Sequence, residues 1–291
     1  QLLGGVFGDY KFDDKFSFRS QISVDHNSII EDQFESSKTA IGGFLQSVGG
    51  AGYGVYSTGD YTALLGNAVL RFNDEFSAVH NISALAGVEA YYKKNRTSSV
   101  NGRLFPSDDF TYITSAGTVD AGSSFVNQNS LLSAFAEAKY DYDNRYFATA
   151  SLRADGSSRF GSGNKFGLFP SASLAWRISE ESFFNVRVIE DLKLRASYGL
   201  TGNERIGNFQ YLGTFGSSTY NGASGVAPDN LSNQLLQWES TGEYNAGVDL
   251  TAFEGRVQFN TDVYYKLTSS LLFDQPLPFT TGFGSQTGNI G

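Results

Sequence analysis

Residues 165–177, KFGLFPSASLAWR, decide the fold, because every second side chain is apolar. The apolar set is Phe166, Leu168, Pro170, Ala172, Leu174 and Trp176, with mostly lysine, glycine and serine between them. Since successive side chains of a β-strand point to opposite faces, the alternation predicts a strand with one apolar and one polar face. The pattern returns at 145–155 and 242–252, so it belongs to the chain as a whole.

Composition favours an all-β fold and excludes several functions. The 291 residues include 33 glycines, 5 prolines and 15% aromatic residues, which suits one large β domain. The absence of cysteine excludes disulfides, a cysteine-ligated zinc site and a thiol nucleophile. The net charge of -9 argues against nucleic acid as a partner, because a phosphate backbone requires a basic face.

The start of the chain, QLLGGVFGDYKF, already reads as a strand and carries no basic, apolar leader. No run approaches about 18 consecutive apolar residues, so no spanning helix is predicted. We therefore expect a fragment whose N-terminal part was removed or lies elsewhere.

Short and long connections alternate along the chain. Short turns are expected at 11–16, 71–76, 140–147, 180–193 and 253–256, where Asp, Asn and Gly dominate the tight ones. Longer polar connections are expected at 27–60, 93–128, 156–164, 201–240 and from 269 to the end. Transmembrane barrels have short periplasmic turns and long outer loops, so the pattern predicts a transmembrane antiparallel β-barrel segment of about ten strands.

Aromatic side chains crowd beside the short turns, as in the girdles of barrels at the membrane interface. They are Phe12, Phe16, Phe18, Phe72, Phe76, Tyr140, Tyr142, Tyr146 and Phe147. The apolar register predicts lipid contact for Ala150, Leu152, Leu168, Ala172, Leu174 and Val248. Open edges are costly in hydrocarbon, so other strands must complete the barrel unless it closes as a small pore. A soluble jelly roll or propeller is the alternative.

Several long motifs resemble the SusC/RagA family of TonB-dependent outer-membrane transporters. They are YFATASLRADGSSRFGSGNKFGLFPSASLAWRISEESFF from 146, LKLRASYGLTGNERIGNFQYL from 192, LLQWESTGEYNAGVDL from 235, FPSDDF at 105–110 and PLPFTTGFGSQTGNIG at the end. The resemblance implies a barrel of about 22 strands. Residues 1–291 would be its middle part, without the plug, the TonB-engaging segment and the closing C-terminal strands.

The resemblance also implies partners. These are a SusD-like surface lipoprotein that captures oligosaccharide or peptide nutrients, the TonB complex acting through the plug, and the outer-membrane lipid of a Gram-negative, Bacteroidetes-like cell. No cofactor is implied, and calcium in a loop or in the lid partner is left open.

Enzymatic signatures are weak, and we predict that the protein is not an enzyme. His26 and His80 are the only histidines and offer no acid-base or metal cluster. The glycine-rich GGAGYG at 49–54 lacks the strand and helix of a phosphate-binding loop. Asp108, Asp109 and Asp155 offer oxygen ligands to calcium without EF-hand spacing, which favours loop solvation or turn capping.

Two groups of residues are candidates for function. Charged side chains of the polar register are predicted to face a water-filled lumen or a plug, foremost Arg153, Asp155, Arg177 and Arg195, together with Glu137, Lys139, Lys165, Lys193, Asp249, Asp262 and Lys266. Loop aromatics are predicted to stack on sugars or peptide side chains, above all Phe105, Tyr112, Tyr211, Phe215 and Trp238. Simple solvation of the lumen and packing of loops on one another are the alternatives.

The predicted function is TonB-driven import of an oligosaccharide or peptide across the outer membrane, working with the lipoprotein. A passive porin or a surface adhesin barrel without energy coupling is the second hypothesis. A soluble β-sandwich that binds carbohydrate is the third.

Overall fold

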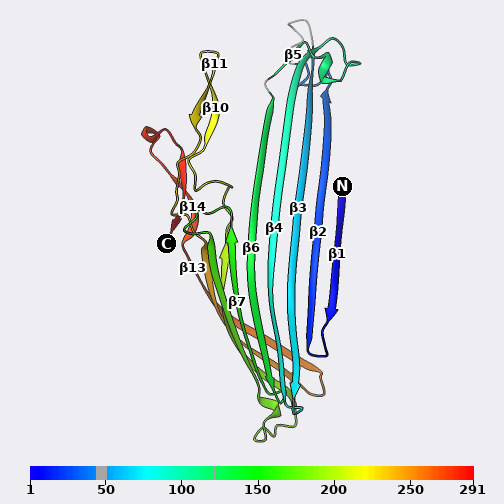
Figure 1. Cartoon of the computed structure of the whole chain (residues 1–291), viewed down its shortest axis with the longest axis vertical. Helices are drawn as coiled ribbons and strands as arrows, with labels where there is room; N and C mark the ends of the chain where they lie inside the picture. Colours follow the sequence, from blue (N-terminus) through cyan, green and yellow to red (C-terminus); the bar gives the residue numbers. More distant parts are fainter. Residues whose placement is uncertain (44–50, 121) are drawn as a thin grey trace. The chain divides into compact units, whose positions relative to one another are not determined.

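The computed structural model describes residues 1–43, 51–120 and 122–291, and most of them lie in β-strands. Ten strands form one sheet in the order β1-β2-β3-β4-β6-β7-β8-β9-β12-β13, and the short β5 pairs with β4 (Figure 1). The bounds are Leu2–Lys11 (β1), Phe16–Glu35 (β2), Ala51–Phe76 (β3), His80–Phe105 (β4), Thr118–Val119 (β5), Ser123–Tyr142 (β6), Tyr146–Ser157 (β7), Phe166–Arg177 (β8), Ile189–Asn203 (β9), Glu239–Ala252 (β12) and Val257–Ser269 (β13). The predicted all-β fold of about ten strands is confirmed.

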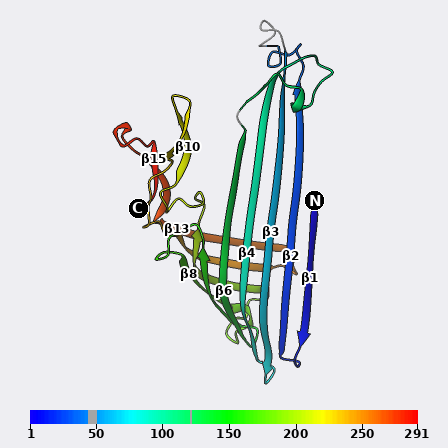
Figure 2. The same cartoon turned by 45° about the horizontal axis from the view of Figure 1, so that its top comes forward.

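Two hairpins form separate two-stranded sheets that are not part of this sheet (Figure 2). The first joins β10 (Phe215–Tyr220) to β11 (Ala223–Pro228), and the second joins β14 (Leu271–Pro276) to β15 (Ser285–Ile290). Three 3-10 turns complete the described elements: η2 (Ile113–Ser115), η3 (Ile178–Glu180) and η4 (Phe279–Thr281). Within the described ranges no helix has the length and apolarity needed to cross a membrane.

Contacts divide the chain into two compact units. Unit 1 comprises residues 1–6, 22–65 and 91–129, and its interior holds Phe105, whose ring meets that of Phe34 at 5.1 Å between centroids. Unit 2 comprises residues 7–21, 66–90 and 130–291. Its buried apolar side chains include Phe160, Phe169 and Leu236.

Most of the expected short turns are confirmed. Asp13 Oδ1 accepts hydrogen bonds from the backbone of Lys15 at 2.8 Å and of Phe16 at 2.6 Å, which closes the turn between β1 and β2. The turn between β6 and β7 places Asp143 and Asn144 at positive φ, as a tight hairpin requires. The turn between β12 and β13 also falls where expected, at residues 253–256.

The turn expected at 71–76 was misplaced. β3 continues to Phe76, and the chain reverses at Ser77 and Ala78, which take positive φ values of 49° and 58°. Asp74, which carried the turn signal, instead accepts a hydrogen bond from Lys15 Nζ at 2.8 Å. Pairing between strands therefore overrode the local preference for Asn and Asp in turns.

The strands also extend farther than expected into the predicted connections 27–60 and 93–128. β2 runs to Glu35, β3 begins at Ala51 and β4 continues to Phe105. Polar pairs join β2 to β3 where this extension begins: His26 Nδ1 lies 3.0 Å from Thr62 Oγ1, and Ser28 donates to Asp60 at 2.8 Å. Of the first connection, residues 44–50 lie outside the described residues, as does 121 of the second.

The register from β6 to β13 separates two faces of the sheet, as the alternation predicted. We call the face that carries Leu152, Leu174 and Val248 the apolar face. Leu174 stands opposite Ala148 on β7 and Ala196 on β9. Ala150, Leu168 and Ala172 share this face with them. Lipid contact at these positions stays a prediction.

Candidate functional site

The opposite face, which carries Arg153, Arg177 and Arg195, holds every charged residue paired by the register from β6 to β13; we call it the charged face. It also presents the other strand residues of the predicted lumen group: Glu137, Lys139, Asp155, Lys193, Asp249, Asp262 and Lys266. The alternation of apolar and polar residues therefore predicted correctly which charged side chains share one face of the sheet.

Arg195 ties three neighbouring strands on the charged face. Its Nε and Nη2 donate to the two carboxylate oxygens of Asp249 on β12 at 2.8 and 2.9 Å. Its Nη1 and Nη2 reach Asp262 on β13 at 3.0 and 3.2 Å. Gly247 stands opposite both Arg195 and Asp262, and a Cβ there would come within 2.8 Å of the guanidinium. The guanidinium can therefore cross β12 only because that position has no side chain.

Arg153 forms a second cluster on the charged face. Its Nε donates to Asp155 at 2.7 Å, and its Nη2 donates to Ser133 at 2.8 Å and to Glu89 at 3.3 Å. Arg177 pairs with Asp191 at 3.0 Å. These charges are matched within the sheet, so the face carries few unpaired cations. That it faces a lumen or a plug stays a prediction.

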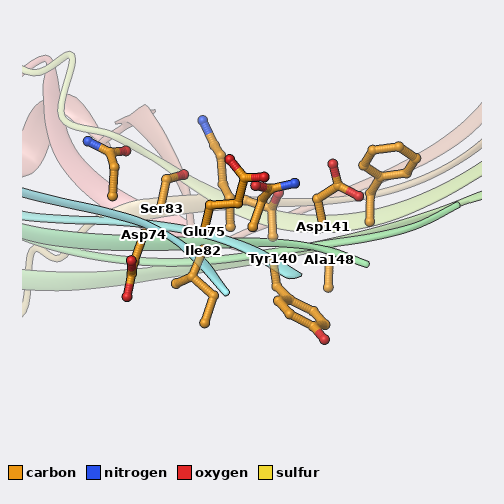
Figure 3. A pocket seen from close by; sticks show the side chains of 12 residues that line it. Asp74, Glu75, Ile82, Ser83, Tyr140, Asp141 and Ala148 are labelled. Carbon is orange, nitrogen blue, oxygen red and sulfur yellow. The ribbon is translucent and has the colours of Figure 1, made fainter. Parts of the chain in front are cut away.

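A groove of about 550 Å³ lies near the turns that join β3 to β4 and β6 to β7. In Figure 3 Ile82, Tyr140 and Ala148 point to one side of the strands, while Ser83 and Asp141 point to the other. The picture shows at close range the alternation that separates the two faces. Asp141 Oδ1 accepts the backbone N–H of Asn144 at 2.9 Å, so it caps the turn.

Aromatic side chains gather on the apolar face beside these turns. The ring centroids of His80 and Tyr142 lie 4.9 Å apart, and Tyr146 stacks on Trp176 at 6.4 Å. The hydroxyl of Tyr146 and the indole N–H of Trp176 both donate to Glu181, and these hydrogen bonds lower the pKa of Glu181 below its usual range. Glu181 was missed in the sequence, because no local pattern marks a carboxylate that meets two rings.

Phe147 does not belong to this aromatic group. The register places it on the charged face, opposite Asp141 and Ala175. Its ring lies 4.5 Å from Lys193 Nζ, which is a cation–π distance. Adjacent residues of a strand point to opposite faces, so Tyr146 and Phe147 had to separate.

The five candidate loop aromatics occupy different surroundings. Phe105 is 1% exposed, whereas Tyr112 is 72% exposed and Phe215 is 70% exposed. Trp238 packs against Phe160 and Phe169, both at 5.3 Å between centroids, and donates to the carbonyl of Lys165 at 2.9 Å. Tyr211 is half-buried beside Gly161. The structure thus leaves Tyr112 and Phe215 open to a ligand, while Phe105 and Trp238 pack loops together.

A carboxylate joins two connections of unit 1. Asp108 accepts the backbone N–H of Ser37 at 2.7 Å and the hydroxyls of Ser36 at 2.8 Å and Ser37 at 2.9 Å. The Ser37 backbone hydrogen bond, followed by the Ser36 hydroxyl, lowers the pKa of Asp108. The connection after β2 is therefore fastened to the one after β4.

Replacement of Asp108 by alanine is expected to release residues 36–43, because three donors lose their acceptor. A pKa of Asp108 below that of an unfolded aspartate means that the contact is fully present above the unfolded pKa and is lost as pH falls through the folded value. The protection factors for hydrogen exchange at 36–43, which correct for the intrinsic pH dependence of exchange, should stay high from pH 7 down to about pH 4 and fall below that. Asp109→Ala is the matched control, and equal exchange in both variants would contradict the contact.

The family model described as "TonB dependent receptor-like, beta-barrel" matches residues 4–291. The chain belongs to the TonB-dependent receptor β-barrel family. TonB-dependent receptor P39 of Formosa agariphila is 39% identical over 76% of this chain and 22% of its own length. TonB-dependent receptor SusC of Bacteroides thetaiotaomicron is 32% identical over 100% of this chain and 29% of its own length.

Solved structures agree with this TonB-dependent receptor barrel in fold. The RagAB peptide importer in its "closed-closed" state superposes with a TM-score of 0.89 at 24% identity, over 99% of this chain and 32% of the other. The chain therefore spans less than a third of the length of these relatives. The resemblance to SusC-type receptors is confirmed.

Proposed function

We propose that the chain forms part of the wall of an outer-membrane transporter that imports an oligosaccharide or a peptide with energy from TonB. The match of the family model to residues 4–291 carries this proposal. Its physical support is the sorting of the sheet into an apolar face and a charged face, which suits lipid on one side and water or a plug on the other.

The proposed partners follow from the relatives. SusC and RagAB support a SusD-like surface lipoprotein, and the family supports engagement of TonB through a plug domain. The RagAB structures are described as those of a peptide importer, which keeps peptides beside oligosaccharides as candidate nutrients. Family members are transporters, so no catalytic role is assigned to any residue of this chain.

Growth of the native host separates energised import from passive diffusion. The strain would be grown with mixed oligosaccharides or mixed short peptides as the limiting nutrient, after deletion of this gene or of tonB. Energised import predicts that both deletions abolish the same growth. Loss of growth only on deletion of this gene, with tonB dispensable, would assign the protein to the passive porins, and no loss in either strain would contradict import.

A further inference from the structure

Unit 2 contains a polar cavity of about 900 Å³ that neither the aromatic stacking nor the charged face accounts for. Its wall comes from Arg159 in the connection between β7 and β8, the connection between β9 and β10, the end of β11 with the residues that follow it, and the β14–β15 hairpin. Nine of the lining residues can make hydrogen bonds through side chains: Arg159, Arg205, Gln210, Asp229, Asn230, Asp274, Ser285, Gln286 and Thr287. The carboxylate of Asp274 is already used, because it accepts a hydrogen bond from the hydroxyl of Thr287. We call this space the loop cavity.

Side-chain hydrogen bonds to backbone groups hold the wall of the loop cavity in place. Asn230 accepts the N–H of Thr214 at 2.8 Å and donates to the carbonyl of Leu212 at 2.9 Å. Gln286 donates to the carbonyl of Ser232 at 2.9 Å, which joins the β14–β15 hairpin to the connection after β11. A pocket with a fixed wall loses less entropy on binding than a loop that must first be ordered.

The two arginines of the loop cavity differ in their partners. Arg159 donates from Nε to Asn208 at 2.9 Å and from Nη1 to the carbonyl of Glu204 at 3.0 Å. Arg205, which is exposed, uses only its backbone N–H, toward Asn203 at 3.1 Å. Among the described residues its guanidinium has no hydrogen bond or ion pair. The cavity therefore presents one unused guanidinium.

An unused carboxylate lines the same cavity. Asp229 is exposed, and its side chain has no hydrogen bond or ion pair within the described part of the chain. Arg205 and Asp229 do not pair with each other, so the two charges stand at separate points of one wall. A guanidinium binds a carboxylate in a planar, two-pronged geometry, and a carboxylate suits an ammonium group.

We propose that the loop cavity binds a ligand that carries a carboxylate group, and that this carboxylate pairs with the guanidinium of Arg205. This inference rests on the proposed function and narrows its substrate class to acidic ligands. The carboxylate has two sources among imported nutrients: a uronic acid of an oligosaccharide, or the C-terminus of a short peptide. Asp229 separates them, because a peptide also carries an ammonium group and a uronic acid does not.

Calorimetric titration of the complete, detergent-solubilised protein tests the assignment with three probes: trigalacturonate, trialanine and the neutral sugar maltotriose. Arg205→Gln should weaken binding of the acidic probe about tenfold or more, the effect of losing a charge-assisted hydrogen bond. Arg187→Gln is the matched control, because Arg187 is an exposed arginine outside the cavity. Arg205→Lys should restore part of the affinity. Circular dichroism checks that every variant keeps its sheet.

Substitution of Asp229 identifies which kind of ligand supplies the carboxylate. If trialanine binds, Asp229→Asn weakens it and trigalacturonate does not bind, the ligand is a peptide. If trigalacturonate binds, Asp229→Asn leaves it unchanged and trialanine does not bind, the ligand is an acidic sugar. If both probes bind and Arg205→Gln weakens both, the cavity accepts the carboxylate from either source. Maltotriose binding as tight as that of both acidic probes overturns the proposal, as does unchanged affinity in Arg205→Gln or absence of binding by all probes. Binding that survives while growth proves independent of tonB would refute energised import and leave the cavity assignment standing.

Discussion

Leu174→Arg is expected to destabilise the folded protein by about 2 to 4 kcal/mol if the residue lies near the middle of the membrane. Leu174 lies on the apolar face and is 65% exposed, so an arginine there would meet lipid instead of a protein partner. The free energy of unfolding in lipid vesicles, from urea titration of tryptophan fluorescence, measures the loss.

Ser173→Arg is the matched control for this prediction. Ser173 is the adjacent residue on β8 and stands opposite Thr149 and Ser197 on the charged face. An arginine there would enter polar surroundings and should cost far less, since one step along a strand reverses the face. Equal losses in the two variants would show that the faces have been assigned wrongly.

Phe105→Ala is expected to cost about 3 to 5 kcal/mol of local stability in unit 1, as for other buried phenylalanines. The ring is 1% exposed, and it fills the space above Gly52 and Gly54, where a Cβ would lie 3.4 and 2.8 Å from ring atoms. Limited proteolysis of the segments 36–43 and 106–120 should become much faster, because the ring packs against Phe34 and is buried where β2 and β4 lead into these segments.

Tyr112→Ala provides the contrast, since Tyr112 is 72% exposed and its loss removes little packing. Its cleavage rate should match that of the unmodified protein. If instead Phe105→Ala leaves the proteolysis unchanged, the ring does not support the loops, and a direct role of Phe105 in ligand contact would regain support.

Alternation made the strands and the sorting of charge predictable, because a period of two is imposed by the backbone and needs no knowledge of neighbours. Arg153, Arg177 and Arg195 were grouped correctly for this reason. Their partners were not predictable. Which carboxylate meets Arg195 depends on the order and register of β9, β12 and β13, and no short-range signal specifies that order.

The features that the sequence did not reveal have non-local causes. The turn at Ser77 and Ala78 has no Asn, Asp or Gly at its positive-φ positions, and strand pairing determines where it falls. Ligand contact by Phe105 stays a prediction, but its burial against Phe34, which is distant in sequence, could not be predicted from the local pattern. The loop cavity was invisible for the same reason, because residues of separate connections and hairpins make its wall.

The guanidinium of Arg195 crosses β12 at Gly247, so its ion pairs depend on the register between β12 and β13. These ion pairs favour the native register over shifted ones when the strands pair. If β13 slipped by one residue against β12, Asp262 would turn to the apolar face and leave Arg195 short of one carboxylate. If it slipped by two toward Asp249, two like charges would stand opposite each other, which is unfavourable. Only the observed alignment gives Arg195 both carboxylates, so one cation and one missing side chain distinguish the native alignment from its nearest competitors.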